Sequence, residues 1–390
     1  MTRSARFTLP ARLAWRQLRA ERARLLSAIA GVMFACVLVF MQLGFRSALF
    51  DSATSLPRAM QGELFLIQPL TTALFRPEPL PRVRAFQTLA VPEVAQAVPI
   101  YLAQGTWRNP VTGVRRAIQL IGFDTEAGAV DFPGLSRLIP QLKRPDTIAF
   151  DSRSRPEFGP VPALFAEHGP FKVQIANREV EIVGIVELGA SFGADGNAVM
   201  SEVNFRRLVK ERQASNTDLV ALRLVPGADI KAVQARLTAL LPPDVRVLTH
   251  PELVQWERDY WEKTTPIGFI FAFGSLMGLI VGMVIVYQIL FADIASHLSE
   301  YATLKAMGYS GGYLSRMVLA AAAILALLGF VPGLLASAGL YDLVAKATLL
   351  PLRMDLSRGF LVFGLIFGMC AFAGLLAMRK LRDADPVDMF

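Results

Sequence analysis

Four long stretches of the chain contain no charged side chain, and their spacing limits the fold more than any other feature. They are residues 25–45, 264–292, 317–341 and 359–378, with 21, 29, 25 and 20 residues. A helix needs about 20 apolar residues to cross a hydrocarbon core roughly 30 Å thick. Between the first stretch and the second lie residues 46–263, which have an ordinary globular composition. We therefore expect an α-helical membrane protein with four transmembrane helices and a large α+β extracytoplasmic domain inserted between helices 1 and 2.

The distribution of charge orients these helices. The formal net charge is +8, and residues 1–24 contribute most of it through seven Arg and one Glu, whereas residues 46–263 are nearly neutral. A basic flank beside a membrane is not a nucleic-acid-binding face, and such flanks stay in the cytoplasm. We expect a multi-pass protein of the bacterial inner (plasma) membrane, with cytoplasmic segments 1–24, 293–316 and 379–390. Segments 46–263 and 342–358 are then periplasmic.

Two alternatives concern the first of these segments. A cleaved signal peptide would also begin with basic residues, but its apolar core runs to about 7–15 residues, and the first stretch is longer. Residues 1–24 themselves predict an amphipathic helix at the membrane surface, because Arg12, Arg16 and Arg19 form a stripe beside a face that contains Trp15. A basic flank without defined structure is the other interpretation.

Residues 46–263 alternate between strand and helix patterns. Runs 63–68, 114–123, 171–176, 180–188 and 217–225 predict strands, and runs 202–212 and 229–241 predict helices. Proline clusters favour a division into two lobes near 145–160. The two cysteines, Cys36 and Cys370, both lie in membrane stretches, so we expect no disulfide bond in this domain.

A helix is expected to lead from the domain into the second membrane stretch. Thr249 and Glu252 fit a capping box that opens a helix. The helical pattern then passes Trp256 and Trp261, which are typical of a membrane boundary, and reaches Pro266. Either one helix continues with a kink at this proline, or the chain breaks near 263–266.

Small residues recur at helical spacing inside two of the membrane stretches. Gly274, Gly278 and Gly282 follow one another every four residues, and Gly364 and Gly368 repeat the pattern in the last stretch. Such a ridge lets two helix backbones approach closely. The sequence leaves open whether the partner helix belongs to the same chain or to a second copy.

Motifs for catalysis or cofactor binding are scarce. The sequence has no G-x-x-x-x-G-K-[ST] phosphate loop and no H-E-x-x-H, and with only three His and two Cys we expect no metal and no cofactor. Residues 189–193 fit G-x-S-x-G, which would make Ser191 a nucleophile with His250 downstream. A glycine-rich turn follows where that motif requires a helix, so a surface loop is the preferred interpretation.

The loop at 293–316 has the clearest local pattern. It begins with a helical face formed by His297, Tyr301 and Leu304, and Gly308 is placed to end that helix. A short, shaped cytoplasmic turn between two membrane helices can dock into a groove of a cytosolic partner. A plain connecting turn is the alternative.

At this loop the chain resembles a known family. The segment EYATLKAMGY (300–309) is similar to the coupling segment of FtsX-like permease domains. The motifs SRPEFGP (154–160) and SFGADGN (191–197) and the ending DADPVDMF (383–390) resemble those of the DevC-type ABC exporter permease, within the broader MacB-like group. The order of one helix, an outer domain and three helices resembles this family along the whole chain.

The resemblance implies a non-catalytic permease subunit that works as a homodimer in membrane lipid. It implies a separate cytoplasmic ABC ATPase, a periplasmic membrane-fusion adaptor, a TolC-like outer-membrane channel, and mechanotransmission that exports a lipid-like or hydrophobic substrate. The residues expected to contact the ATPase are His297, Glu300, Tyr301, Leu304, Lys305, Met307 and Gly308. A membrane-tethered periplasmic sensor or scaffold, and a membrane-anchored serine hydrolase using Ser191, remain as alternatives.

Overall fold

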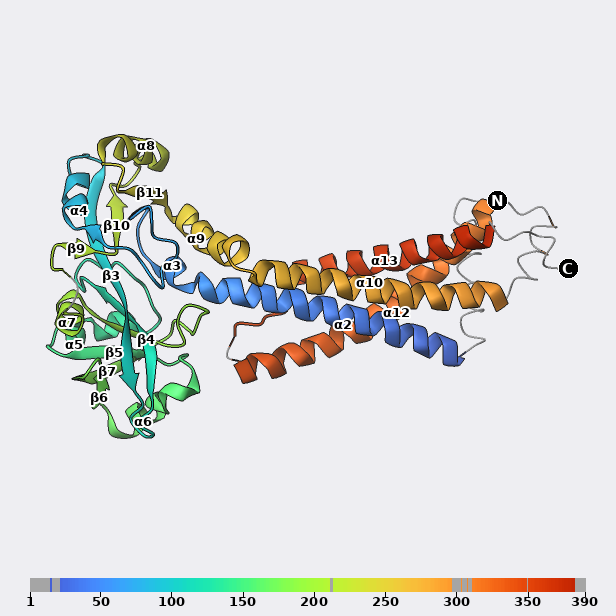
Figure 1. The fold of residues 1–390 in the computed structure, drawn as a ribbon, viewed down its shortest axis with the longest axis horizontal. Helices are drawn as coiled ribbons and strands as arrows, with labels where there is room; N and C mark the ends of the chain where they lie inside the picture. Colours follow the sequence, from blue (N-terminus) through green and yellow to red (C-terminus); the bar gives the residue numbers. More distant parts are fainter. Residues whose placement is uncertain are drawn as a thin grey trace. The chain divides into compact units, whose positions relative to one another are not determined.

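The computed structural model describes Trp15 and residues 22–210, 213–296, 303, 307, 311–348 and 350–382. The chain forms two compact units (Figure 1). The helical unit comprises Met1–Ala48, Gly268–Ala347 and Leu352–Phe390, and the α/β unit comprises Leu49–Ile267 and Thr348–Pro351. Each unit is described below by itself.

A nine-stranded sheet forms the centre of the α/β unit, in the order β11-β1-β10-β3-β4-β8-β5-β7-β6. Strands β2 and β9 make a separate pair. The strands are β1 (Leu64–Ile67), β2 (Leu80–Pro81), β3 (Val94–Arg108), β4 (Arg115–Phe123), β5 (Thr147–Asp151), β6 (Phe171–Ile175), β7 (Arg178–Val186), β8 (Asn197–Ser201), β9 (Asn216–Thr217), β10 (Leu219–Leu224) and β11 (Arg246–Thr249). The expected division near 145–160 falls on β5, which pairs with β7 and β8 inside this sheet.

Alternation along the strands gives the sheet one continuous core on one face and two separate cores on the other. In β1, Phe65 and Ile67 join the continuous core, whereas Leu64 and Leu66 join one of the two cores opposite. Successive side chains of a strand point to opposite faces, so both faces of β1 are buried. The second opposite core gathers around Trp107 and Phe150. The unit thus has two separate cores on one face of a single sheet, and the division into two lobes stays a prediction.

Short helices cover these cores, as Figure 1 shows for α8 beside β11. They are α3 (Ser55–Ala59), α4 (Val83–Thr88), η1 (Leu135–Leu138), α5 (Ile139–Leu142), η2 (Pro156–Phe158), α6 (Val161–His168), α7 (Glu202–Leu208), α8 (Ile230–Leu240) and α9 (His250–Asp259). In α8, Val233 and Leu237 pack on β1, β10 and β11. In α7, Phe205 lies against Gly122, where an added Cβ would come within 2.6 Å of the Phe205 Cβ.

Helix α9 begins with the predicted capping box. The Thr249 hydroxyl accepts a hydrogen bond from the Glu252 N–H, and the Glu252 carboxylate accepts one from the Thr249 N–H. The helix then passes into one π-helical turn, η3 (Tyr260–Thr264), after which Thr265 is extended. The chain therefore breaks at Thr265 before Pro266, as the second sequence interpretation had it, and no single helix continues through this point.

Four of the described helices are long and apolar enough to span a membrane, as the charge-free stretches predict. They are α2 (Arg22–Ala53), α10 (Ile267–Ser296), α12 (Gly311–Thr348) and α13 (Leu356–Arg382). Most residues of each helix are apolar, as is expected for side chains that contact lipid rather than water. The protein is therefore a multi-pass membrane protein with a large α/β domain.

The helices of the helical unit alternate in direction. Residues along α10 approach α2 in reverse order, since Gly274 lies at Gln42 and Gly282 at Ala35. Residues along α12 approach α2 in the same order, with Gly329 at Val32 and Gly333 at Cys36. Helix α13 runs antiparallel to α12, as the pairs Gly374–Val318 and Phe363–Phe330 indicate. Thus α2 and α12 point one way, and α10 and α13 point the other way.

Candidate functional site

Most of the residues expected to contact an ATPase lie outside the described part of the chain. These are His297, Glu300, Tyr301, Leu304, Lys305 and Gly308, together with Arg12, Arg16 and Arg19 of the N-terminal segment. Of the same sets, Met307 and Trp15 are described, and both side chains are exposed. The Met307 N–H donates to the Thr303 carbonyl oxygen (3.0 Å), as in a helical turn. The assignments to these segments stay predictions.

The glycines predicted to pack helices fall into two groups. At Gly282 an added Cβ would lie 2.5 Å from the Ala35 Cβ, and at Gly278 it would lie 3.3 Å from the Leu38 Cβ. Together with Gly274, these glycines therefore face α2 of the same chain. By contrast, Gly364 and Gly368 have no heavy atom of a neighbouring residue within 4 Å of such a Cβ, so their face of α13 is open within the described chain.

Asp151 joins the two outer-domain motifs. It is fully buried at the end of β5. Its carboxylate accepts hydrogen bonds from the N–H groups of Leu188 (3.0 Å) and Gly189 (2.8 Å). It also accepts one from Nδ2 of Asn197 (2.8 Å), the last residue of the SFGADGN motif. Sequence analysis missed Asp151, although it lies three residues before the other motif and follows a strand-like run of apolar residues.

Further contacts join the motif at 154–160 to the motif at 191–197. Arg155 pairs with Asp195 (Nε to Oδ1, 2.7 Å), and the Arg155 N–H donates to the Asp195 carbonyl oxygen (2.9 Å). At Gly196 an added Cβ would lie 2.9 Å from both the Ser154 Oγ and the Phe158 ring. Since only glycine fits so close an approach, the motifs at 154–160 and 191–197 form one local structure, here called the motif loop.

Ser191 serves the turn inside the motif loop. Its Oγ accepts a hydrogen bond from the Ala194 N–H (3.2 Å), and its own N–H donates to the Ala194 carbonyl oxygen (2.7 Å). His250 bonds elsewhere, with Nε2 at 2.9 Å from the Pro57 carbonyl oxygen. A nucleophilic serine needs a base within hydrogen-bond reach, and the described contacts of Ser191 include no histidine, so they favour the surface-loop interpretation.

An aromatic cluster lies beside the motif loop. It consists of Phe50, Phe75, Phe192, Tyr260 and Trp261. Trp261 is at its centre, with ring centroids 5.5 Å from Phe75, 5.7 Å from Phe192 and 5.2 Å from Tyr260. The cluster brings together the end of α2, the η3 turn that precedes α10, and the motif loop. Trp261 is buried within the α/β unit, and its predicted place at a membrane boundary stays a prediction.

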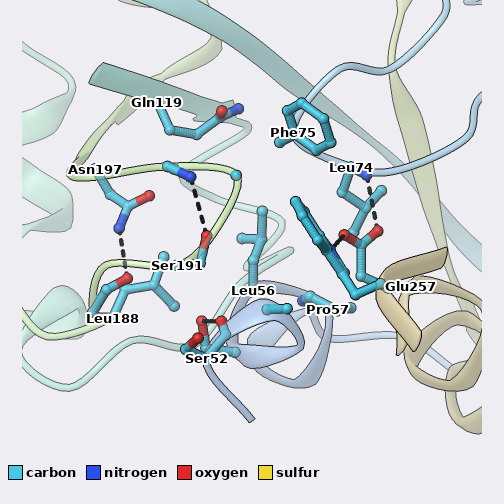
Figure 2. A pocket seen from close by; sticks show the side chains of 16 residues that line it. Ser52, Leu56, Pro57, Leu74, Phe75, Gln119, Leu188, Ser191, Asn197 and Glu257 are labelled. Atoms are coloured by element: carbon cyan, nitrogen blue, oxygen red, sulfur yellow. Dashed lines mark hydrogen bonds between the residues drawn. The ribbon is translucent and has the colours of Figure 1, made fainter. Parts of the chain in front are cut away.

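A buried carboxylate adjoins this cluster (Figure 2). Glu257 is only 3% exposed. Its Oε2 accepts a hydrogen bond from the Leu74 N–H (2.9 Å), as Figure 2 shows. Its Oε1 accepts one from the Trp261 Nε1–H (3.0 Å). Burial raises the pKa of the Glu257 carboxyl to about 7, against the lowering effect of these two donors. The arrangement ties α9, residues 71–76 and η3 into one joint.

No group of three or more His, Cys, Asp or Glu in the described ranges is placed to hold a metal ion. The described contacts connect α9, residues 74–75, η3 and the motif loop.

Two family models match the chain. The FtsX-like permease C-terminal model matches residues 272–386, and the MacB-like periplasmic core domain model matches residues 25–240. A comparison with curated proteins finds no match.

Solved structures similar to the chain include the periplasmic region of MacB from Actinobacillus actinomycetemcomitans. It is 12% identical with a TM-score of 0.35, over 51% of this chain and 94% of that one. The extracellular domain of the ABC-type transporter YknZ from Gram-positive bacteria is 16% identical with a TM-score of 0.32, over 48% of this chain and 98% of that one.

Proposed function

Because this chain belongs to the family of permeases with a MacB-like periplasmic core domain and an FtsX-like C-terminal domain, we propose that it is the membrane subunit of an ABC exporter. The observation that carries the proposal is the pair of family matches, which together include most of the α/β unit and most of each membrane helix. An ABC-type transporter permease is not itself the catalytic subunit. ATP hydrolysis is therefore assigned to a separate cytoplasmic ATPase.

The directions of the membrane helices support the proposed topology. A chain that crosses a bilayer four times must alternate in direction, and α2 and α12 point opposite to α10 and α13. With the basic N-terminal segment in the cytoplasm, the α/β unit is periplasmic and the segment 293–316 is cytoplasmic. Both termini then lie on the side of the ATPase.

The aromatic cluster supports mechanotransmission. Phe50 near the end of α2 and Trp261 in η3, just before α10, belong to the same buried cluster. A displacement of either membrane helix along its axis would thus reach the motif loop through contacts of 5–6 Å between ring centroids. ATP-driven motion would move the periplasmic domain in this way, and a lipid-like or hydrophobic substrate would leave through an adaptor and a TolC-like channel. The proposed assembly contains two copies of the chain.

The contact with the ATPase is open to a direct experiment. Reversing the charges at Glu300 and Lys305 should reduce capture of an ATPase with a Walker A motif and uncouple ATP hydrolysis from export. The matched control reverses Glu126 and Lys143, an exposed ion pair of the α/β unit (2.7 Å), and should leave both unchanged. Normal capture and normal export in the first variant would contradict the assignment of the 293–316 turn. If the unaltered chain captures no such ATPase, the exporter proposal itself fails.

A further inference from the structure

A small cavity lies next to Glu257 inside the α/β unit (Figure 2). Its volume is about 30 Å³, and sixteen residues line it. They come from the end of α2 and α3, from residues 74–75, from β4, from the motif loop with the two residues before it, and from α9 with η3. One water molecule needs about 10–15 Å³ measured in this way. The cavity therefore has room for one or two waters but not for a lipid-like substrate.

Gln119 is the first sign that the cavity is hydrated. Its side chain lines the cavity and is 3% exposed, yet neither its Oε1 nor its Nε2 has a hydrogen-bond partner among the described residues. Leaving a buried polar group unpaired is energetically costly, so such groups almost always have a partner. Since the adjoining space fits water, ordered water is the expected partner of this amide.

Glu257 is the second sign, because it is the only ionisable carboxylate or cation among the lining residues. Other charged side chains of the surrounding elements do not line the cavity, among them Asp51, Arg58, Arg76, Arg153, Arg155, Glu187, Asp195, Glu252, Arg258, Asp259 and Glu262. Several of them are engaged elsewhere: Asp51 pairs with Arg58 (3.1 Å), and the Arg258 guanidinium lies over the Phe50 ring (5.3 Å). The buried Asp151 does not line the cavity either, and its carboxylate is bonded to the N–H groups of Leu188 and Gly189 and to the side-chain amide of Asn197. No cation of these elements thus compensates the buried carboxylate from within the cavity.

We propose that this cavity is a hydrated proton-binding site, in which Glu257 binds a proton that comes from the external solvent and is relayed by cavity water, and thereby loosens its hold on Leu74 and Trp261. An ionised carboxylate accepts hydrogen bonds from both N–H donors. The protonated group is a weaker acceptor, and its new O–H needs an acceptor of its own. The Gln119 Oε1 or a water bonded to it can supply that acceptor. Proton uptake therefore shifts the hydrogen bonding of Glu257 from Leu74 and Trp261 toward the cavity.

Because of its position, the site would let proton binding affect the connection to α10. Trp261 is the centre of the aromatic cluster and belongs to η3, the last turn before the break that leads into α10. With burial raising the pKa of Glu257 to about 7, small changes of external pH would alter the fraction of chains in which this joint is tight. The site makes the joint sensitive to the acidity of the compartment that the α/β unit faces.

Tryptophan emission of the full chain in lipid nanodiscs tests the proposal without any partner. The emission intensity or wavelength, recorded between about pH 5 and pH 9, should change with a midpoint at about pH 7. The titration should disappear in Glu257→Gln and in Trp261→Phe. The titration should persist in the control Glu252→Gln, because the hydrogen-bond partners of Glu252 lower the pKa of this carboxyl to about 2. An unchanged titration in Glu257→Gln, or a flat profile for the unaltered chain, would overturn the proposal.

A second measurement covers the case in which Glu257→Gln does not fold. Infrared difference spectra of the unaltered chain, recorded on acidification through pH 7, should show the carbonyl band of a protonated carboxyl in a poorly solvated site. Gln119→Leu removes the amide that organises the water, so the same band should appear at a higher pH. Absence of the band above about pH 6 would refute proton binding, and it would leave the exporter proposal untouched because no ATPase takes part.

Discussion

The close approach of α2 and α10 at Gly282 yields a sharp mutational prediction. In Gly282→Ala the new Cβ would lie 2.5 Å from the Ala35 Cβ and 2.7 Å from the Met369 Sδ. Carbon atoms in good contact are about 3.5–4.0 Å apart, so the two helices must separate by about 1 Å. Met369 can change rotamer, but the Ala35 Cβ is fixed to the α2 backbone. Overpacking of this kind costs about 1–3 kcal/mol.

The matched control is Gly364→Ala, since nothing lies within 4 Å of a Cβ at that position. Both changes replace glycine by alanine inside a membrane helix, so the helix propensity gain of up to about 1 kcal/mol is common to both. The difference between the two free energies of unfolding then isolates the packing cost. We expect Gly282→Ala to be less stable than Gly364→Ala by about 1–3 kcal/mol.

Unfolding in mixed micelles titrated with a denaturing detergent measures this difference. Equal stability of the two variants, or a more stable Gly282→Ala, would refute the packing of α10 on α2 through this ridge. A loss of self-association in Gly364→Ala with unchanged unfolding would instead identify α13 as a contact between two copies of the chain.

Three further predictions concern the α/β unit. Asp151→Ala should destabilise the chain by at least about 2–3 kcal/mol in urea, because it leaves the buried donors of Leu188 and Gly189 unpaired; a loss under 1 kcal/mol would contradict the buried network. Thr249→Ala removes the capping box of α9 and should cost about 1 kcal/mol, whereas Thr249→Ser should cost little. The Glu257 carboxyl has a folded pKa raised from 4.5 to about 7, so its favourable contribution is present below about pH 4.5 and is lost as the pH rises through about 7. This loss is about 3 kcal/mol at most, and the free energy of unfolding of Glu257→Gln should lack it; parallel pH profiles for the two proteins would count against it.

The membrane helices were predictable because their signal is local and long. More than 18 residues without charge leave few alternatives to a spanning helix. Three of the four stretches lie wholly inside long helices of the structure, and the fourth lies inside α10 from Ile267 onward. The capping box at Thr249 and Glu252 was equally readable, since both hydrogen bonds act within four residues. Features that depend only on residues close together in the sequence can therefore be predicted from it.

Other features depend on contacts between distant segments and could not be derived. Strand β3 was not expected, because its residues mix small, polar and apolar types along Val94–Arg108 and its burial is set by neighbouring strands. Glu257 stands in the polar sequence QWERDYWEK, which is typical of an exposed helix. Only the packing of residues 74–75 and the motif loop against α9 buries it.

The most direct test of the account is to determine on which side of the membrane the α/β unit and the 293–316 segment lie. Val111 in the α/β unit and Met307 in the 303–307 region both have exposed side chains, and the native Cys36 and Cys370 are buried. In intact cells, a membrane-impermeant maleimide should label Val111→Cys, and it should label Met307→Cys only after the membrane is opened. Equal labelling of both positions in intact cells would contradict a periplasmic domain driven by a cytoplasmic ATPase.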